Sequence, residues 1–156
     1  MRPALSYRFS RSKSPRGPIL RPLLPVQLVY KADRPIQTVM LIDSGADFSL
    51  LPRSLAKALE IPLSTLSMDS SVGISGEPID VAWANVRMTF GQRNATFEID
   101  LPIQVVQEGD GPVVPLLGRH PFFRDFDISF RMGFAETKGK FVISPVTRRR
   151  KDKDYA

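Results

Sequence analysis

The fold is decided by the stretch Thr38-Val39-Met40-Leu41-Ile42-Asp43-Ser44-Gly45-Ala46-Asp47-Phe48-Ser49-Leu50-Leu51. Its continuous apolar run is typical of a strand that is covered on both faces. Asp43 follows this strand directly, and Gly45 allows the backbone to turn tightly behind it. Because carboxylates are rarely buried without a partner, Asp43 needs either such a partner or a chemical role.

Length and composition indicate one soluble globular domain. The chain has 156 residues, of which 42% are hydrophobic and 24% are charged, ordinary values for a domain with its own core. The absence of cysteine excludes disulfides, thiolate metal sites and a cysteine nucleophile. No apolar run approaches the length of a membrane span, and the N-terminus lacks the apolar region of a secretory signal. We therefore expect no membrane span, and a cytoplasmic location is favoured.

The positive charge is concentrated at the two ends of the chain. Residues 1–21 carry +6 with no acid and residues 148–156 carry +3, which leaves −3 for residues 22–147 because the whole chain carries +6. We predict a basic disordered N-terminal tail over residues 1–18, a domain over residues 19–146 and a basic C-terminal tail over residues 147–156. Such tails can bind nucleic acid or an acidic surface, although a basic end is more often only solvated.

Strand patterns dominate the domain. We expect strands over 23–30, 36–42, 79–90, 95–106 and 113–117, a closing hairpin of 126–130 with 140–143, and two short helices over 52–60 and 119–125. A glycine-rich hairpin tip is expected over 72–79. This succession of short strands predicts a mostly β domain, either a small barrel or a sandwich.

Most familiar catalytic arrangements are excluded by the residues present. His120 is the only histidine, and no Gly-x-Ser-x-Gly motif is present, so a serine triad is not supported. The sequence also lacks a cluster of metal ligands and both common phosphate-binding loops. We expect no metal and no cofactor.

Carboxylate chemistry remains. Two carboxyl groups that are held close together share one proton, so that one acts as an acid while the other draws a proton from water. The chain has one Asp-Ser-Gly turn, at Asp43, since the Asp-Ser-Ser at residues 69–71 has neither the glycine nor an apolar strand before it. The second carboxylate would then come from another copy of the chain, related by a two-fold axis.

The segment Leu41-Ile42-Asp43-Ser44-Gly45-Ala46-Asp47 resembles the signature of retropepsin-like (retroviral-type) aspartic proteases. The segment Val114-Pro115-Leu116-Leu117-Gly118-Arg119 is similar to that family's apolar-apolar-Gly-Arg segment, and Gly73-Ile74-Ser75-Gly76 lies where the family has its glycine-rich flap. The resemblance spans roughly residues 20–145. It implies a small closed acid-protease barrel that acts as a homodimer.

The resemblance also implies roles for the residues of the Asp-Ser-Gly turn. Asp43 would be the catalytic carboxylate, paired with Asp43 of a second copy around the attacking water. Ser44 would brace the two loops across the dimer axis, and Gly45 would keep the turn tight. The alternative at this position is a turn aspartate in an inactive scaffold.

Further residues are implied to bind substrate. Asp47 would contact the main chain of a peptide and pair with Arg119, and Ile74, Ser75 and Gly76 would lie near the tip of the flap. A purely structural salt bridge and an ordinary hairpin turn are the corresponding alternatives.

The resemblance therefore implies an aspartic endopeptidase that is active as a homodimer on peptide or protein substrates. The alternative is a non-catalytic module with the same fold that dimerises or binds peptides. A third hypothesis is nucleic-acid binding through the basic ends, which would be steeply salt-dependent.

Overall fold

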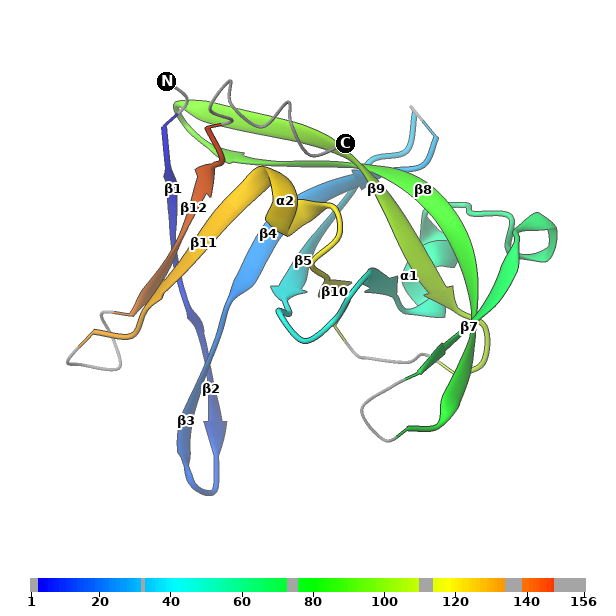
Figure 1. Ribbon diagram of the computed structural model, residues 1–156, viewed down its shortest axis with the longest axis horizontal. Helices are drawn as coiled ribbons and strands as arrows, with labels where there is room; N and C mark the ends of the chain where they lie inside the picture. The colour runs from blue at the N-terminus through cyan, green and yellow to red at the C-terminus, as the bar shows by residue number, and fades with distance from the viewer. Residues whose placement is uncertain (1–2, 32, 73–75, 110–113, 134–138, 148–156) are drawn as a thin grey trace, which may run out of the picture.

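Strands that lie far apart in the sequence close into a barrel. The computed structural model describes residues 3–31, 33–72, 76–109, 114–133 and 139–147. Among these residues, six strands follow the order β4-β5-β10-β6-β9-β8, and β8 pairs again with β4 (Figure 1). Their bounds are Leu23–Val29 (β4), Ile36–Ile42 (β5), Ser49–Leu51 (β6), Pro78–Gln92 (β8), Ala95–Val106 (β9) and Leu116–Leu117 (β10). The predicted mostly β barrel is confirmed.

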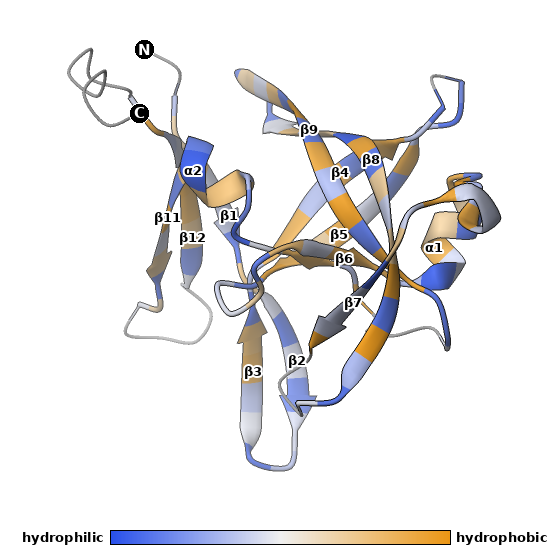
Figure 2. Ribbon diagram, turned by 45° about the vertical axis from the view of Figure 1, so that its right-hand side comes forward, coloured by the Kyte–Doolittle hydropathy of each residue, from blue (hydrophilic) through white to orange (hydrophobic). Residues whose placement is uncertain are grey.

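The core fills the interior of this barrel. Along β8, the buried residues Val86, Met88 and Phe90 alternate with exposed or partly exposed ones, and on β9 Leu101 and Ile103 are fully buried. Figure 2 shows the resulting alternation of hydrophobic and hydrophilic residues along the two long strands. Burying each such side chain contributes about 1.5–3 kcal/mol to folding.

The short strand β10 brings two distant strand ends together. It pairs in parallel with β5, with Leu116 opposite Leu41 and Leu117 opposite Ile42. On its other side it pairs antiparallel with β6, with Leu116 opposite Leu50. The residues that follow β5 and β10, which are Asp43 and Gly118, therefore leave the barrel side by side.

In the part of the chain that the structure describes, two short α-helices are attached to the barrel. Helix α1 (Arg53–Ala58) begins directly after Pro52. The start of a helix tolerates proline, because an N–H group there would have no partner within the helix. Helix α2 (Phe122–Asp125) begins later than the predicted 119–125, because Arg119 and His120 pair with the segment 46–48 and Pro121 is the N-cap. It ends where predicted, since Phe126 has extended backbone angles and opens β11. The ring of Phe126 lies 5.0 Å from that of Phe122 and 5.2 Å from that of Phe90, which ties α2 to the barrel.

The prediction of a disordered segment over residues 1–18 is wrong for most of that segment. Strand β1 (Leu5–Arg8) pairs with β12 (Lys140–Pro145), which pairs with β11 (Phe126–Arg131). Strands β2 (Ser10–Ser14) and β3 (Gly17–Arg21) form a separate two-stranded ribbon. For β1 the physical reason is burial: Leu5 is 2% exposed, and the ring of Tyr7 stacks on that of Phe141 at 5.3 Å. The ribbon β2–β3 has no buried residue and is held by the pairing of its two strands. The prediction of disorder followed the basic composition of this segment and missed the short alternation of more and less buried residues along β1.

The remaining elements precede β8 in the sequence. A 3-10 helix (Leu63–Thr65, η1) leads into β7 (Met68–Val72), which pairs antiparallel with β8 as the two arms of a hairpin. Strand β7 was not predicted, because its residues are polar or exposed and carry no alternating apolar pattern. No helix among the described residues has the length and apolar content needed to cross a bilayer.

Candidate active site

The turn that carries Asp43 is held by its own backbone and carboxylate. The N–H of Asp43 donates to the carbonyl oxygen of Leu117 at 3.0 Å, which continues the pairing between β5 and β10. Oδ1 of Asp43 accepts a hydrogen bond from the N–H of Gly45 at 2.9 Å, and the N–H of Ala46 donates to the carbonyl oxygen of Asp43 at 3.3 Å. Asp43 is half-buried, whereas Ser44 and Gly45 are exposed. The carboxylate is thus fixed at the end of β5. Only Met40 and Ile42 of this strand are buried, whereas Gln37 and Val39 are exposed, so the prediction of a strand covered on both faces is wrong.

The far side of this loop is hydrogen-bonded to the segment that follows β10. The N–H of Arg119 donates to the carbonyl oxygen of Ala46, and the N–H of His120 donates to that of Asp47, both at 2.8 Å. Phe48 and His120 continue this pairing as an isolated parallel bridge. The Asp43 loop is therefore anchored along its length to residues 118–120.

Gly118 allows this close approach. A Cβ atom at Gly118 would lie 2.3 Å from the carbonyl carbon of Phe48, closer than any side chain permits. The N–H of Gly118 donates to Oγ of Ser49 at 3.0 Å in a buried position. The glycine in the predicted apolar-apolar-Gly-Arg segment therefore has a steric reason, and Ser49 is a supporting residue that sequence reasoning missed.

The predicted pair between Asp47 and Arg119 is present. Nη2 of Arg119 contacts Oδ1 of Asp47 as an ion pair. The side chain of Arg119 is 54% exposed and that of Asp47 is 73% exposed, so solvent screening limits the contribution of the pair to about 1 kcal/mol or less. The pair therefore adds little to the stability of the fold, and its main effect is to orient the side chain of Asp47 at the edge of the loop.

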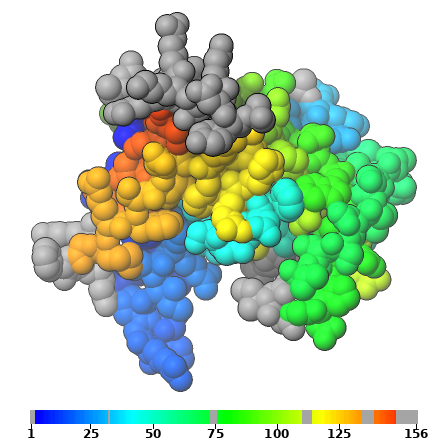
Figure 3. Space-filling view, in the orientation of Figure 1, coloured from blue at the N-terminus to red at the C-terminus, as the bar shows by residue number. Residues whose placement is uncertain are grey.

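A cavity of about 390 Å³ lies beside the loop. Its lining comes from the loop, from β7 and β8, and from the barrel strands: Ala46, Asp47, Phe48, Leu50, Asp69, Ser70, Ser71, Val72, Ile79, Val81, Trp83, Gln104 and Leu116. The space-filling view shows the loop, in cyan, and the β7–β8 hairpin, in green, on the same face of the molecule (Figure 3). The cavity is large enough for a side chain of a bound peptide and is mostly apolar.

An aromatic and acidic cluster forms one wall of the cavity. The rings of Phe48 and Trp83 meet edge to face at 4.9 Å. Nε1–H of Trp83 donates to Oδ2 of Asp69 at 3.0 Å, and the N–H of Ser70 donates to Oδ1 of Asp69 at 2.8 Å. These hydrogen bonds, that of Trp83 first, lower the pKa of Asp69. Sequence analysis did not single out these residues as site residues; a lone tryptophan in a strand was the available signal.

The structure brings five of the predicted site residues into this one loop system: Asp43, Ser44, Gly45, Asp47 and Arg119. Of the predicted flap residues, Gly76 lies in the part of the chain that the structure describes. Its φ of 78° is in the left-handed region that favours glycine. The predictions for Ile74 and Ser75 lie outside the described residues. Among the described residues, no group of three or more histidine, aspartate or glutamate side chains could hold a metal ion.

Comparison with known sequences gives a family match over this region. The sequence model of the family described as "Aspartyl protease" matches residues 29–120. That span includes β5, the Asp43 loop and the Gly118-Arg119 segment. No curated protein matches the chain.

Comparison with solved structures also finds matches. A retropepsin-like aspartic protease from Rickettsia conorii matches with a TM-score of 0.54 and 15% identity, over 90% of this chain and 91% of that one. The protease of EIAV, in complex with the inhibitor HBY-793, matches with a TM-score of 0.46 and 22% identity, over 67% of this chain and 86% of that one. The retroviral protease-like domain of Ddi1 from Leishmania major gives a TM-score of 0.43 and 10% identity, over 73% and 82%.

Proposed function

The chain belongs to the aspartyl protease family, and on that premise we propose that it is an aspartic endopeptidase. Two Asp43 carboxylates, one from each copy in a homodimer, would activate the water that attacks the peptide bond. The observation that carries this proposal is the position of Asp43, half-buried on a closed turn that directly follows the buried residue Ile42 of β5. Such a turn presents a carboxylate in one fixed orientation.

The free oxygen of this carboxylate suits the chemistry. Oδ1 of Asp43 accepts the hydrogen bond from Gly45, while Oδ2 has no hydrogen-bond partner among the described residues. Two such groups facing each other would share one proton, because two adjacent negative charges repel. The ionised carboxylate takes a proton from the water molecule, and the oxygen of that water attacks the carbonyl carbon of the peptide bond. The protonated carboxyl supplies the proton that the leaving amine nitrogen acquires.

A second copy of the chain would complete the site. The sequence has a single Asp-Ser-Gly turn, and the exposure of Ser44 and Gly45 leaves that turn accessible to another molecule. A two-fold axis beside Asp43 would bring the same turn into place twice, which is the self-complementary geometry common in homodimers. Ser44 would then contact its counterpart across the axis.

The substrate would be an extended peptide that passes the cavity beside the loop. Asp47 would receive hydrogen bonds from its main chain, held in position by Arg119. Ile74, Ser75 and Gly76 would close over it at the tip of the β7–β8 hairpin, a closure that excludes water during the reaction. The mostly apolar lining of the cavity would accept a hydrophobic side chain.

A diverse peptide pool incubated with purified protein at mildly acidic pH tests the proposal. We expect cleavage that Asp43→Asn abolishes, whereas the control Asp33→Asn, at an exposed turn residue, leaves it unchanged. Cleavage that persists in Asp43→Asn would overturn the assignment. A stable dimer that hydrolyses no peptide at any pH would instead support the non-catalytic module.

A further inference from the structure

A row of three positive side chains crosses one end of the sheet β1-β12-β11. Arg8 lies directly opposite Lys140, and Lys140 lies directly opposite Arg131. Directly opposed residues point to the same face, and like charges in such positions destabilise a sheet. All three residues are exposed, and none forms an ion pair with another described residue. The fold therefore maintains a repulsive arrangement at this end of the sheet.

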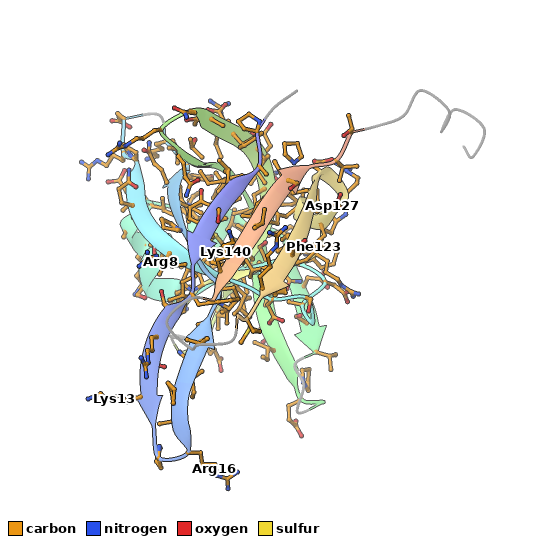
Figure 4. The ribbon with its side chains drawn as sticks, turned by 90° about the vertical axis from the view of Figure 1, so that its left-hand side faces the viewer. Arg8, Lys13, Arg16, Phe123, Asp127 and Lys140 are labelled. Carbon is orange, nitrogen blue, oxygen red and sulfur yellow. The ribbon has the colours of Figure 1, made fainter. Side chains whose placement is uncertain are left out.

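The row lies on the solvent face of the sheet. The neighbouring residues Tyr7 and Phe141 point to the other face, where their rings stack and Phe141 is fully buried. Figure 4 shows Arg8 and Lys140 close together on adjacent strands of this side of the molecule. Asp127, which lies on the same face of β11, is four residues along the strand from Arg131 and thus at the opposite end of the sheet.

The ribbon β2–β3 extends this positive surface away from the body. Phe9 alone separates β1 from β2, and the ribbon projects below the barrel in Figures 1 and 4. Lys13 lies on one arm of the ribbon and Arg16 lies at its turn, where the N–H of Arg16 donates to Oγ of Ser14. Asp33 is the first acidic residue of the chain. We call Arg8, Lys13, Arg16, Arg131 and Lys140 the basic strip.

The ribbon contributes little to the core. No residue of β2 or β3 is buried, and a two-stranded hairpin without a core is only marginally stable in water. Strand β2 and the turn carry side chains of the kinds that contact phosphate, namely lysine, arginine and the hydroxyls of Ser10 and Ser12, whereas β3 carries Pro18, Ile19 and Leu20 before Arg21. The shape of the ribbon also restricts the partner, because a two-stranded ribbon fits the wide major groove of B-form DNA. The narrow major groove of an RNA duplex does not admit it.

We propose that the basic strip binds double-stranded DNA, with the ribbon in the major groove and the row Arg8-Lys140-Arg131 on the adjacent phosphates. This binding is independent of peptide hydrolysis and would occur in the inactive variant Asp43→Asn as well. An acidic protein segment could satisfy the charges but gives no reason for the protruding ribbon. It is therefore an outcome that the test distinguishes.

Binding of a short fluorescent DNA duplex to the full chain, followed by anisotropy over a range of salt concentrations, tests the proposal. The double variant Arg8→Gln/Lys140→Gln removes two charges from the row. The control Arg93→Gln/Lys57→Gln removes the same two kinds of charge from exposed positions outside the strip. The plot of log K against log salt has a negative slope. We expect Arg8→Gln/Lys140→Gln, the strip variant, to make this slope shallower by about 2, one unit for each lost phosphate contact, and the control to change it little. The tip variant Lys13→Gln/Arg16→Gln should behave like the strip variant.

Thermal unfolding supplies a second readout. Because Arg8→Gln/Lys140→Gln relieves the repulsion between opposed cations, we expect it to unfold at the same or a higher temperature than the wild type while it loses DNA affinity. Equal weakening by the strip and control variants would overturn the proposal in favour of net charge alone. Tighter binding to an RNA duplex or to polyglutamate than to the DNA duplex would show that the class of partner is wrong.

Discussion

The hydroxyl of Ser49 on β6 accepts a hydrogen bond from the backbone N–H of Gly118 at 3.0 Å, and this contact is buried. Ser49 follows the Asp43 loop, and Gly118 follows β10. The bond joins the end of the Asp43 loop to the segment that carries Arg119. One serine side chain therefore helps to set the spacing between two parts of the site that lie 69 residues apart.

Ser49→Ala should destabilise the protein. The substitution leaves the buried N–H of Gly118 without a partner, which costs about 1–3 kcal/mol. Urea denaturation would measure the loss in the free energy of unfolding. Ser129→Ala, at an exposed position of β11, is the matched control, and an equal effect of the two substitutions would contradict this role for Ser49.

The hydrogen bond between Trp83 and Asp69 should be visible in a pH titration. Trp83 is the only tryptophan, so its fluorescence reports on this contact. The pKa of Asp69 is lowered from its ordinary value of 3.8, first by the Trp83 bond and then by that of Ser70. The bond is therefore present at neutral pH, and any stability that it contributes is lost only as the pH falls through the lowered pKa. We expect the fluorescence transition below pH 3.8, and its absence in Asp69→Asn. A transition that Asp69→Asn retains would assign it to another group.

Tyr7→Phe should leave the protein as stable as before or more stable. The hydroxyl oxygen of Tyr7 is buried with no hydrogen-bond partner among the described residues, and burial raises the pKa of this phenol to about 12. Removing an unsatisfied buried hydroxyl saves a desolvation cost of about 1 kcal/mol, while the stacking on Phe141 is kept. Thermal unfolding and urea denaturation measure the effect. A clear loss of stability would mean that the hydroxyl has a partner.

Arg119→Ala should affect substrate binding more than stability. The pair of Arg119 with Asp47 is exposed, so its loss should cost less than about 1 kcal/mol of unfolding free energy. Arg124→Ala removes the neighbouring exposed pair with Asp125, at 3.0 Å, and serves as the control. We expect both variants to unfold alike and Arg119→Ala alone to raise KM for a peptide severalfold. Equal KM values in the two variants would reduce the Asp47–Arg119 pair to a surface contact.

The sequence was informative where apolar pattern and turn chemistry agree. The run before Asp43 and the segment before Gly118 predicted two strands, and β5 and the shorter β10 lie there. The pair of Asp47 with Arg119 could be named in advance because the resemblance placed both residues. These features depend on local signals in two short stretches.

Other features depend on contacts that no local pattern reports. The role of Ser49 follows from a hydrogen bond to a residue in a distant segment. Strand β1 looked like part of a basic tail because its pairing partner, β12, lies at the other end of the chain. Strand β7 has no buried face, so its pairing with β8 left no alternation to detect. Partners far away in the sequence decide all three.

The most direct test of the central claim is a mixing experiment that measures whether each site needs two Asp43 residues. Wild-type protein and Asp43→Asn protein are unfolded together, refolded at equal amounts, and assayed for peptide cleavage at a fixed total concentration. If the site is shared across a two-fold axis, random pairing leaves about a quarter of the dimers with two Asp43 residues, and activity falls to about a quarter of the wild-type value. Activity at about half of the wild-type value would show that each chain carries a complete site of its own, and activity at about three quarters would show that one Asp43 suffices in a shared site. Either result would contradict a site that needs two Asp43 residues.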